Sequence, residues 1–228
     1  MYPVQILPAG DAALLVQLPQ TIDASVNGWC VAFADDTIRR HGTAVRDAVV
    51  GYCSVTVYFD PVRTDPEWLE KELLDAATAT GPTTVQDGRN VNVPVVYGGS
   101  FGPDIEDVAR FAGCTAEEVV ARHSAVTYRV YLVGFVPGFA YMAEVDPRIA
   151  APRRATPRTE VPAGSVAIAG GQTGIYPDVT PGGWHIIGRT PLRLFDAART
   201  EPSLLKAGDQ VRFRPVSEAD FARLGCES

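Results

Sequence analysis

The sequence has few of the residues that build metal and redox centres. Its 228 residues include only four cysteines and three histidines. The cysteines form no C-x-x-C pair and are scattered along the chain, at Cys30, Cys53, Cys114 and Cys226. Scattered cysteines favour reduced thiols and a cytoplasmic protein. Histidines this dispersed predict no metal site.

Signals for a membrane or for export are also lacking. No stretch approaches the ~20 apolar residues that a membrane-spanning helix requires. The N-terminal residues MYPVQILPAGDAALLV have neither the basic region nor the long apolar core of a signal peptide. These absences predict a soluble protein of the cytoplasm without a membrane partner.

Positive charge is in deficit. The chain carries 20 basic and 27 acidic residues, a net charge of -7. A protein that binds nucleic acid normally shows an excess of positive charge or a concentrated basic arm. Neither is present, so nucleic acid is not an expected partner. Hydrophobic residues make up 46% and charged residues 21%, as in ordinary globular proteins.

The N-terminal third has the pattern of a compact α/β unit. The apolar run from Ala12 to Leu18 predicts a strand, and the residues from Ser25 to His41 have helical spacing. Val45 to Phe59 is rich in β-branched and aromatic residues, which favours strand. Asp65 followed by Pro66 is typical of a helix start, and that helix should run to about Thr80.

A polar, turn-rich stretch from Gly81 to Asn90 reads as a linker, so we expect domains at residues 1–84 and 85–228. The second domain should open with a strand from Val91 to Tyr97. Further elements are then expected: two helices (Asp104 to Phe111 and Thr115 to Ser124) and strands at Val126–Phe135, Ser165–Ala169, His185–Ile187, Leu192–Phe195 and Gln210–Phe213. Short apolar runs between Gly/Pro turns indicate an antiparallel barrel or sandwich.

The stretch from Gly134 to Asp196 combines glycine and proline turns with arginines and aromatic residues. Its arginines are candidates for binding a carboxylate or a phosphate, since a guanidinium can donate two parallel hydrogen bonds. Arg153 and Arg158 are the candidate substrate-binding residues, and Arg189, in a tightly fixed backbone, is a candidate catalytic residue. The alternative is that they brace loops through backbone carbonyls or pair with Glu160 or Asp178.

Two loops in this stretch could line a ligand site. The turn from Ala169 to Gly174 has successive glycines that let N–H groups approach an anion, but a plain hairpin turn is the alternative. It is no Walker loop, because G-x-x-x-x-G-K-[ST] is absent from the chain. Gln172 and Tyr176 could read an amide edge. Phe139, on a rigid loop at a barrel mouth, could bind a ligand, anchor a partner or pack in the core.

One histidine is a candidate acid or base. His123 ends a predicted helix, where it could exchange a proton with a substrate or simply interact favourably with the helix C-terminus. His185 and His41 are weaker candidates. No metal ligand set is expected among the three.

Three blocks of the sequence resemble a known family. GFVPGFAYM, PRRATPRTEVPAGSVAIAGGQTGIYP and TPGGWHIIGRTPLRLFD are similar to blocks of the allophanate hydrolase subunit 1 family, which includes the KipI-type kinase inhibitor and the B subunit of bacterial 5-oxoprolinase. AGDAALLV and GDQVRF resemble the family's opening and closing blocks. Nothing here resembles the Ser-Ser-Lys machinery of a true allophanate hydrolase, so the family name does not imply that activity.

The resemblance implies an α+β protein with a small N-terminal α/β sandwich and a cyclophilin-like antiparallel β-barrel. It also implies a subunit that is inactive alone. Such a subunit would work with a subunit-2 type partner, resembling the C subunit of 5-oxoprolinase, and a third subunit. The complex would use ATP, shared with the partner, to open 5-oxoproline or a related lactam. The alternative that the resemblance implies is inhibition of a sensor histidine kinase.

Overall fold

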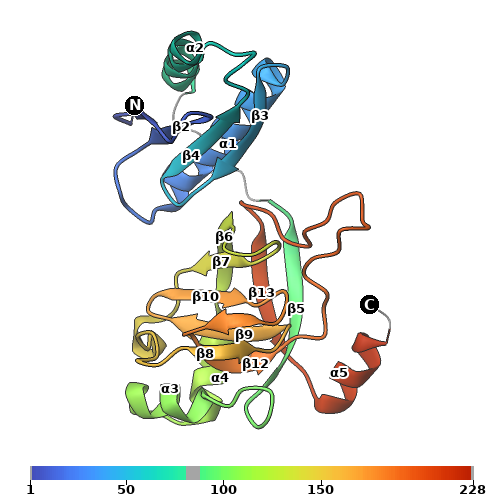
Figure 1. The fold of residues 1–228 in the computed structure, drawn as a ribbon. Coiled ribbons are helices and arrows are strands. Elements are labelled where there is room, and N and C mark those ends of the chain that lie inside the picture. The colour runs from blue at the N-terminus through green and yellow to red at the C-terminus, as the bar shows by residue number, and fades with distance from the viewer. Residues whose placement is uncertain (1, 81–87, 227–228) are drawn as a thin grey trace. The chain divides into compact units, whose positions relative to one another are not determined.

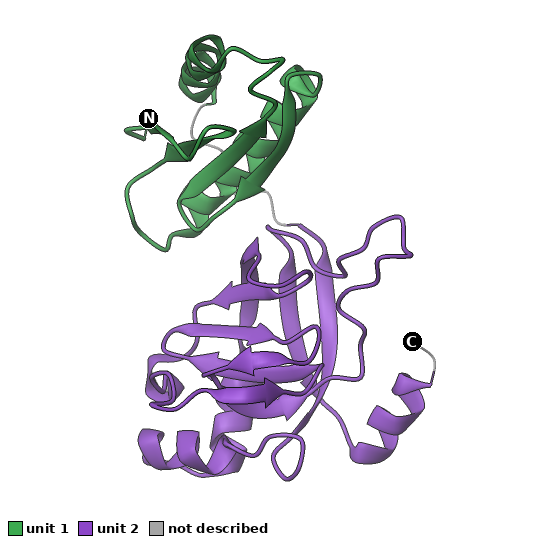
Figure 2. Ribbon diagram, viewed as in Figure 1, with its two compact units in different colours: residues 1–87 green, residues 88–228 purple. Residues whose placement is uncertain are grey.

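The computed structural model describes residues 2–80 and 88–226. The chain forms two compact units, residues 1–87 and 88–228 (Figure 2). The expected domain boundary between residues 84 and 85 lies outside the described residues. None of the helices in the described ranges is long and apolar enough to cross a membrane.

The N-terminal unit is an antiparallel four-stranded sheet with a helix packed on it (Figure 1). Its strands lie in the order β1, β2, β4 and β3. Their bounds are β1 Gln5–Pro8, β2 Ala13–Gln17, β3 Val45–Val50 and β4 Ser54–Phe59. The stretch from Val45 to Phe59 is therefore a hairpin, which turns where the N–H of Gly51 donates to the carbonyl of Ser54 (2.7 Å).

Both helices of this unit begin where side chains cap them. In α1 (Ala24–His41) the Asp23 carboxylate accepts from the N–H groups of Ser25 and Val26. In α2 (Pro66–Ala79) Asp65 is the N-cap and Pro66 the first helical residue, as predicted. The core lies between α1, α2 and the sheet and contains the stacked rings of Trp29 and Phe33, whose centroids are 4.8 Å apart.

The second unit is a closed barrel in the strand order β10, β7, β6, β13, β5, β12 and β9 (Figure 1). The bounds are β5 Asn90–Tyr97, β6 Thr127–Val133, β7 Ala140–Ala143, β9 Ser165–Ala169, β10 Gln172–Ile175, β12 His185–Arg189 and β13 Gln210–Pro215. A separate two-stranded sheet pairs β8 (Arg158–Val161) with β11 (Thr180–Gly182). The expected α+β class with a β-barrel is confirmed.

One strand pair departs from the antiparallel expectation. β13 pairs antiparallel with β6 on one side but parallel with β5 on the other, from Gln210 opposite Asn90 to Pro215 opposite Val95. The barrel closes at this parallel pair, because the strand that ends the barrel lies against the strand that begins it.

The helices of the second unit match the sequence signals except at the C-terminal end. α3 (Ile105–Ala112) and α4 (Ala116–Ala125) were expected, and Thr115 and Glu118 form the predicted capping box. A further helix, α5 (Glu218–Gly225), was not expected. A short 3₁₀ turn, η1 (Pro147–Ile149), precedes the loop that contains Arg153 and Arg154.

The strand expected from Leu192 to Phe195 is wrong. Within the described residues this segment forms only an isolated bridge between Phe195 and Ser203. Leu194 is buried in the barrel core, so the apolar pattern reflects packing rather than a sheet ladder. Burial and strand pairing produce the same short apolar run, and periodicity alone does not separate them.

Side chains alternate between the inside and the outside of the barrel wall, as the pleat requires. On β9, Val166 and Ile168 belong to the core that fills the barrel. Ala167 and Ala169 belong to a second, smaller apolar cluster that includes Phe139. The barrel therefore has a packed interior and a separate cluster on the outer face of its wall.

Candidate functional site

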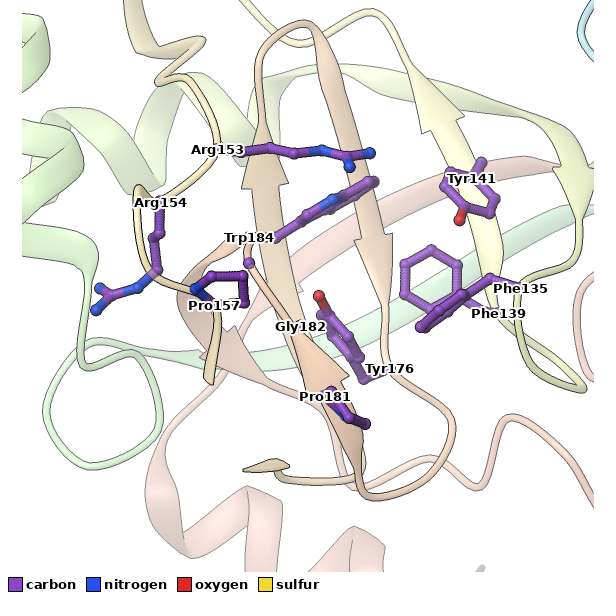
Figure 3. Close-up of a pocket in the computed structure, with 11 residues that line it drawn as sticks. Phe135, Phe139, Tyr141, Arg153, Arg154, Pro157, Tyr176, Pro181, Gly182 and Trp184 are labelled. Atoms are coloured by element: carbon purple, nitrogen blue, oxygen red, sulfur yellow. The ribbon is translucent and has the colours of Figure 1, made fainter. Parts of the chain in front are cut away.

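A cavity of about 330 Å³ lies over the outer cluster rather than inside the barrel (Figure 3). The loop from Gly134 to Phe139 supplies one wall, the loop from Arg153 to Pro157 another, and the ends of β10 and β11 the rest. The lining residues are Phe135, Phe139, Tyr141, Arg153, Arg154, Pro157, Tyr176, Pro181, Gly182, Gly183 and Trp184. The sequence suggested that the loop with Phe139 lies at the barrel mouth. The structure instead places the cavity that this loop lines on the outer wall of the barrel.

Small residues beneath the cavity make room for its aromatic rings. Gly174 lies directly under Phe139, since a Cβ on Gly174 would come within 3.0 Å of the Phe139 ring. Phe139 in turn contacts four other rings, with centroids 4.7 Å from Tyr141, 5.1 Å from Tyr176, 5.6 Å from Trp184 and 5.8 Å from Phe135. Edge-to-face and tilted contacts of this kind stabilise each ring in one position. The cavity therefore has a preformed aromatic floor.

The rim of the cavity contains a strained aromatic residue. Phe135 has a φ of 71°, a conformation that a bulky side chain rarely adopts, and it is 64% exposed. Backbone strain of this kind costs about 1–3 kcal/mol and clusters at functional sites. Gly138, with a φ of 84°, completes the turn. Phe135 therefore lies exposed at the rim, although its backbone conformation and the exposure of its apolar ring to solvent both cost free energy.

Arg153 is the cation of the cavity that no acidic residue neutralises. Its guanidinium carbon lies 6.0 Å from the centre of the Trp184 ring, a cation–π distance (Figure 3). Within residues 2–80 and 88–226 it forms no ion pair, whereas Arg154 and Arg158 both bind Asp104. One arginine is thus left to face a ligand.

Asp104 fixes the loop that carries these arginines. Its carboxylate accepts from Arg154 Nη1, from Arg158 Nη1 and Nη2, and from the N–H of Ile186, each at 2.7 Å. Burial raises the pKa of Asp104, but the hydrogen bonds from Arg158 and Ile186 and the two positive charges outweigh it, so the pKa is lowered. The buried carboxylate therefore stays ionised and ties the arginine loop to β12.

The same carboxylate is part of a group with the geometry of a metal site. One ligand atom each from Asp104, Asp107 and His185 lie within 4.8 Å of one another. Arg154 and Arg158 already occupy the Asp104 oxygens, and two guanidinium charges beside the group oppose a cation. We therefore do not assign a metal to it.

Tyr176 presents its hydroxyl to the cavity. Burial raises the pKa of Tyr176 by more than the nearby backbone N–H of Trp184 and the charges of Arg153 and Arg158 lower it, so the hydroxyl is protonated near neutral pH. The ring is 2% exposed and lies against Gly182, where a Cβ would be 2.3 Å from the phenol oxygen.

Replacing Gly182 with alanine should displace the Tyr176 ring. Because that ring is packed against Phe139, it has little room to move, and overpacking of this kind costs about 1–3 kcal/mol. We expect Gly182→Ala to lower the thermal midpoint of the barrel unit. Gly183→Ala is the matched control, since its Cβ would meet Pro157 at an ordinary 3.5 Å. Equal effects of the two changes would contradict this packing.

His123 lies inside the barrel and does not line the cavity. Thr173 Oγ1 donates to the carbonyl of Ala167 (3.0 Å), so it accepts from His123 Nε2 (2.9 Å). Nδ1 is then the acceptor for the Tyr97 hydroxyl (2.8 Å). Burial lowers the pKa of His123 to about 3. The imidazole is thus a neutral core group in the described structure, stacked on Phe213 at 4.5 Å.

Arg189 and Gln172 are also outside the cavity lining. Arg189 Nε donates to the carbonyl of Ala163 (2.7 Å), which is the loop-bracing alternative. Gln172 begins β10, directly after a hairpin turn in which the N–H of Gly170 donates to the carbonyl of Ala151 (2.7 Å). The glycine turn is therefore a hairpin. Of the residues expected to bind substrate, the cavity brings together Arg153, Phe139 and Tyr176.

Asp104 was not among the residues singled out in the sequence, where Glu160 and Asp178 were named as acids with which the arginines could pair instead of binding a ligand. The partner of Arg158 is instead 54 residues away in sequence, and no local pattern indicates it. Residues 98–102 also match the motif G-x-S-x-G, which is typical of nucleophilic serines. Its Ser100 is exposed and makes no hydrogen bond within the described residues, so nothing there activates it.

Known proteins share both the sequence and the fold. The family described as carboxyltransferase domain, subdomain C and D, matches residues 4–205. The B subunit of 5-oxoprolinase from Bacillus subtilis (strain 168) is 38% identical over 227 residues, 95% of each chain. The corresponding B subunit from Haemophilus influenzae is 38% identical over 218 residues, 92% of this chain and 97% of that one.

A solved structure, of the protein TTHA0988, is 35% identical with a TM-score of 0.80. The match covers 90% of this chain and 40% of that one, so this chain spans about two fifths of that protein's length. The resemblance seen in the sequence blocks is confirmed by these matches. The chain therefore belongs to the family of the carboxyltransferase domain, subdomains C and D, alongside the B subunits of 5-oxoprolinase.

Proposed function

We propose that this chain is the B-type subunit of a multi-subunit 5-oxoprolinase. The observation that carries the proposal is the 38% identity to the Bacillus subtilis protein over 95% of both chains. The cavity supports it, because about 330 Å³ lies at the lower end of the ~300–1,000 Å³ that small-molecule sites occupy.

The cavity suits the chemistry of a lactam acid. In our proposal the Arg153 guanidinium pairs with the ligand carboxylate, and the flat ring lies against Phe139 and Tyr176. Arg158 holds the loop through Asp104 instead of touching the ligand. The expected roles of His123, Arg189 and Gln172 stay predictions, since none of the three lines this cavity.

The residues around the cavity do not fit ATP by themselves. A triphosphate needs several cations or N–H donors in a row. The cavity offers one unpaired guanidinium, that of Arg153, while Arg154 is bound to Asp104. We therefore propose that ATP is shared with a partner protein, and we derive no step through it.

The proposal requires partners. We propose a subunit-2 type protein, resembling the C subunit of 5-oxoprolinase, and a third subunit that completes ring opening. The exposed Phe135 at the rim of the cavity supports a partner on this side of the barrel. The cysteines of the described residues are free, which supports a cytoplasmic location. No observation on this structure favours the alternative of a kinase inhibitor.

Reconstitution tests the proposal. Co-expressed with the subunit-2 type protein and mixed with the third subunit, the chain should produce glutamate from 5-oxoproline and ATP, and omission of any component should abolish it. Arg153→Gln should raise the KM for 5-oxoproline about 10- to 100-fold, because a hydrogen bond to a charged group contributes about 1.5–3 kcal/mol. Glutamate release is the measurement.

Arg199→Gln is the control for this experiment. Arg199 is an exposed arginine of the same unit that pairs weakly with Asp196 (3.5 Å) and does not line the cavity. Its replacement should leave KM unchanged. A complete complex that makes no glutamate would refute the proposed function.

A further inference from the structure

The hydroxyl of Tyr176 has a proton to donate and no acceptor for it. The backbone N–H of Trp184 lies near this oxygen and lowers the pKa of the group, which burial raises. Within residues 2–80 and 88–226 no group accepts the Tyr176 proton. The hydroxyl lies in the cavity and points toward Trp184 (Figure 3). The Tyr176 side chain is 2% exposed, so the cavity is the side from which a partner can reach the hydroxyl. A bound ligand is the natural acceptor.

Arg153 and Tyr176 act on the same space. Both line the cavity, and the Arg153 charge acts on the hydroxyls of Tyr176 and Tyr141, lowering pKa values that burial raises. The cavity therefore offers one cation, Arg153, and the neutral hydroxyls of Tyr176 and Tyr141 on an aromatic floor. A guanidinium binds a carboxylate, and a phenol hydroxyl binds a carbonyl oxygen.

We propose that the cavity recognises two acceptors on one ring, a carboxylate at Arg153 and a carbonyl oxygen at the hydroxyl of Tyr176. The ligand class is then a five- or six-membered cyclic amide that bears a carboxylate. This inference rests on the proposed function, in which the ligand is 5-oxoproline. Tyr176 is thereby the residue that distinguishes a lactam acid from a ring acid without the carbonyl.

The position of the Tyr176 hydroxyl makes this role specific. The phenol is held on two sides, by the packing of its ring on Phe139 (5.1 Å) and by the backbone at Gly182. The backbone N–H of Trp184 lies near the oxygen. A donor that is fixed in this way loses little freedom when it binds, so its hydrogen bond discriminates strongly between ligands.

The test compares the binding of two ligands to the wild-type full chain and to a variant of it. Dissociation constants for 5-oxoproline and cyclopentanecarboxylate, which lacks the lactam carbonyl, are measured by NMR titration. The wild type should prefer 5-oxoproline about tenfold, the effect of one hydrogen bond of about 1.4 kcal/mol. Tyr176→Phe should remove this preference and leave the affinity for cyclopentanecarboxylate nearly unchanged.

A second pair of ligands tests Arg153. 2-Pyrrolidinone has the carbonyl without the carboxylate, so Arg153→Gln should weaken 5-oxoproline about 10- to 100-fold and 2-pyrrolidinone hardly at all. Tyr176→Phe also removes the oxygen that lies near the backbone N–H of Trp184. That loss affects every ligand alike, so only the ratio between ligands reports on recognition.

Tyr141→Phe is the matched control, because Tyr141 lines the same cavity. It should keep the wild-type preference. The inference is overturned if Tyr176→Phe keeps the preference, if Tyr141→Phe removes it, or if 5-oxoproline binds neither the chain nor the assembled complex. A complex that turns over 5-oxoproline while Tyr176→Phe leaves the ligand ratio unchanged sinks this inference and leaves the proposed function intact.

Discussion

Replacing Asp104 with asparagine should lower the free energy of unfolding of the barrel unit by about 3 kcal/mol. The carboxylate is 2% exposed and accepts from two arginines and a backbone N–H. Removing its charge leaves Arg158 without its ion-pair partner and Arg154 with only the more distant Asp107 (4.0 Å). The side chains of Arg154 and Arg158 are 28% and 26% exposed, so neither is fully buried. The loss of folding free energy is therefore at the lower end of the range for a broken buried ion pair. Urea unfolding followed by NMR signals of barrel residues measures it.

Asp107→Asn is the control for this change. Asp107 lies on the same helix, but its side chain is 45% exposed and its close partner is the exposed Arg110 (2.7 Å). Exposed ion pairs contribute less than about 1 kcal/mol. If Asp104→Asn and Asp107→Asn have equal effects, Asp104 does not fix the arginine loop.

Acidification should destabilise the barrel unit well before its carboxylates titrate. His123 has a folded pKa of about 3 and an unfolded value near 6.5. Below pH 6.5 the unfolded chain binds the extra proton, so stability falls with pH until it reaches the folded pKa. The loss is about 2 kcal/mol between neutral pH and pH 5. Asp104, whose pKa is lowered in the fold, contributes its own loss only below about pH 4.

Two variants identify the histidine responsible. His123→Gln should be less stable at pH 7 because it loses the stacking on Phe213, but its stability should be nearly constant between pH 6.5 and 5. His41→Gln, in the other unit, should keep the wild-type slope of barrel stability. Urea unfolding at a series of pH values measures both. A barrel whose stability is constant from pH 7 to 5 would show that His123 accepts a proton within the fold.

Local signals predicted the elements that local chemistry decides. Asp65 with Pro66 and the pair Thr115 and Glu118 mark helix starts because capping involves residues at most three positions apart. The hairpin between β3 and β4 was not separated, because β-branched residues continue on both sides of its short turn. The helix α5 was not predicted because it is short, eight residues, and none of its side chains is buried.

The site was predicted in part. The motif from Gly134 to Asp196 contains most of the residues that line the cavity, and glycine, arginine and aromatic residues together indicated a pocket. Which arginine is unpaired depends on Asp104, 50 residues from Arg154 and 54 from Arg158. That the cavity lies outside the barrel depends on which way each strand faces, and His123 faces inward for the same reason. Only the closed sheet decides these points.

The parallel pair of β5 and β13 sets the order in which the two units can fold. The N-terminal unit completes its sheet from neighbouring segments and can fold early during synthesis. The barrel cannot, because its first strand, which pairs with β12 on one side, gains its second partner only when the strand ending at Pro215 has left the ribosome. At ~5–20 residues per second this interval lasts seconds. During that time the edges of β5 and β6 are open to other chains, so the nascent barrel is the stage most exposed to aggregation.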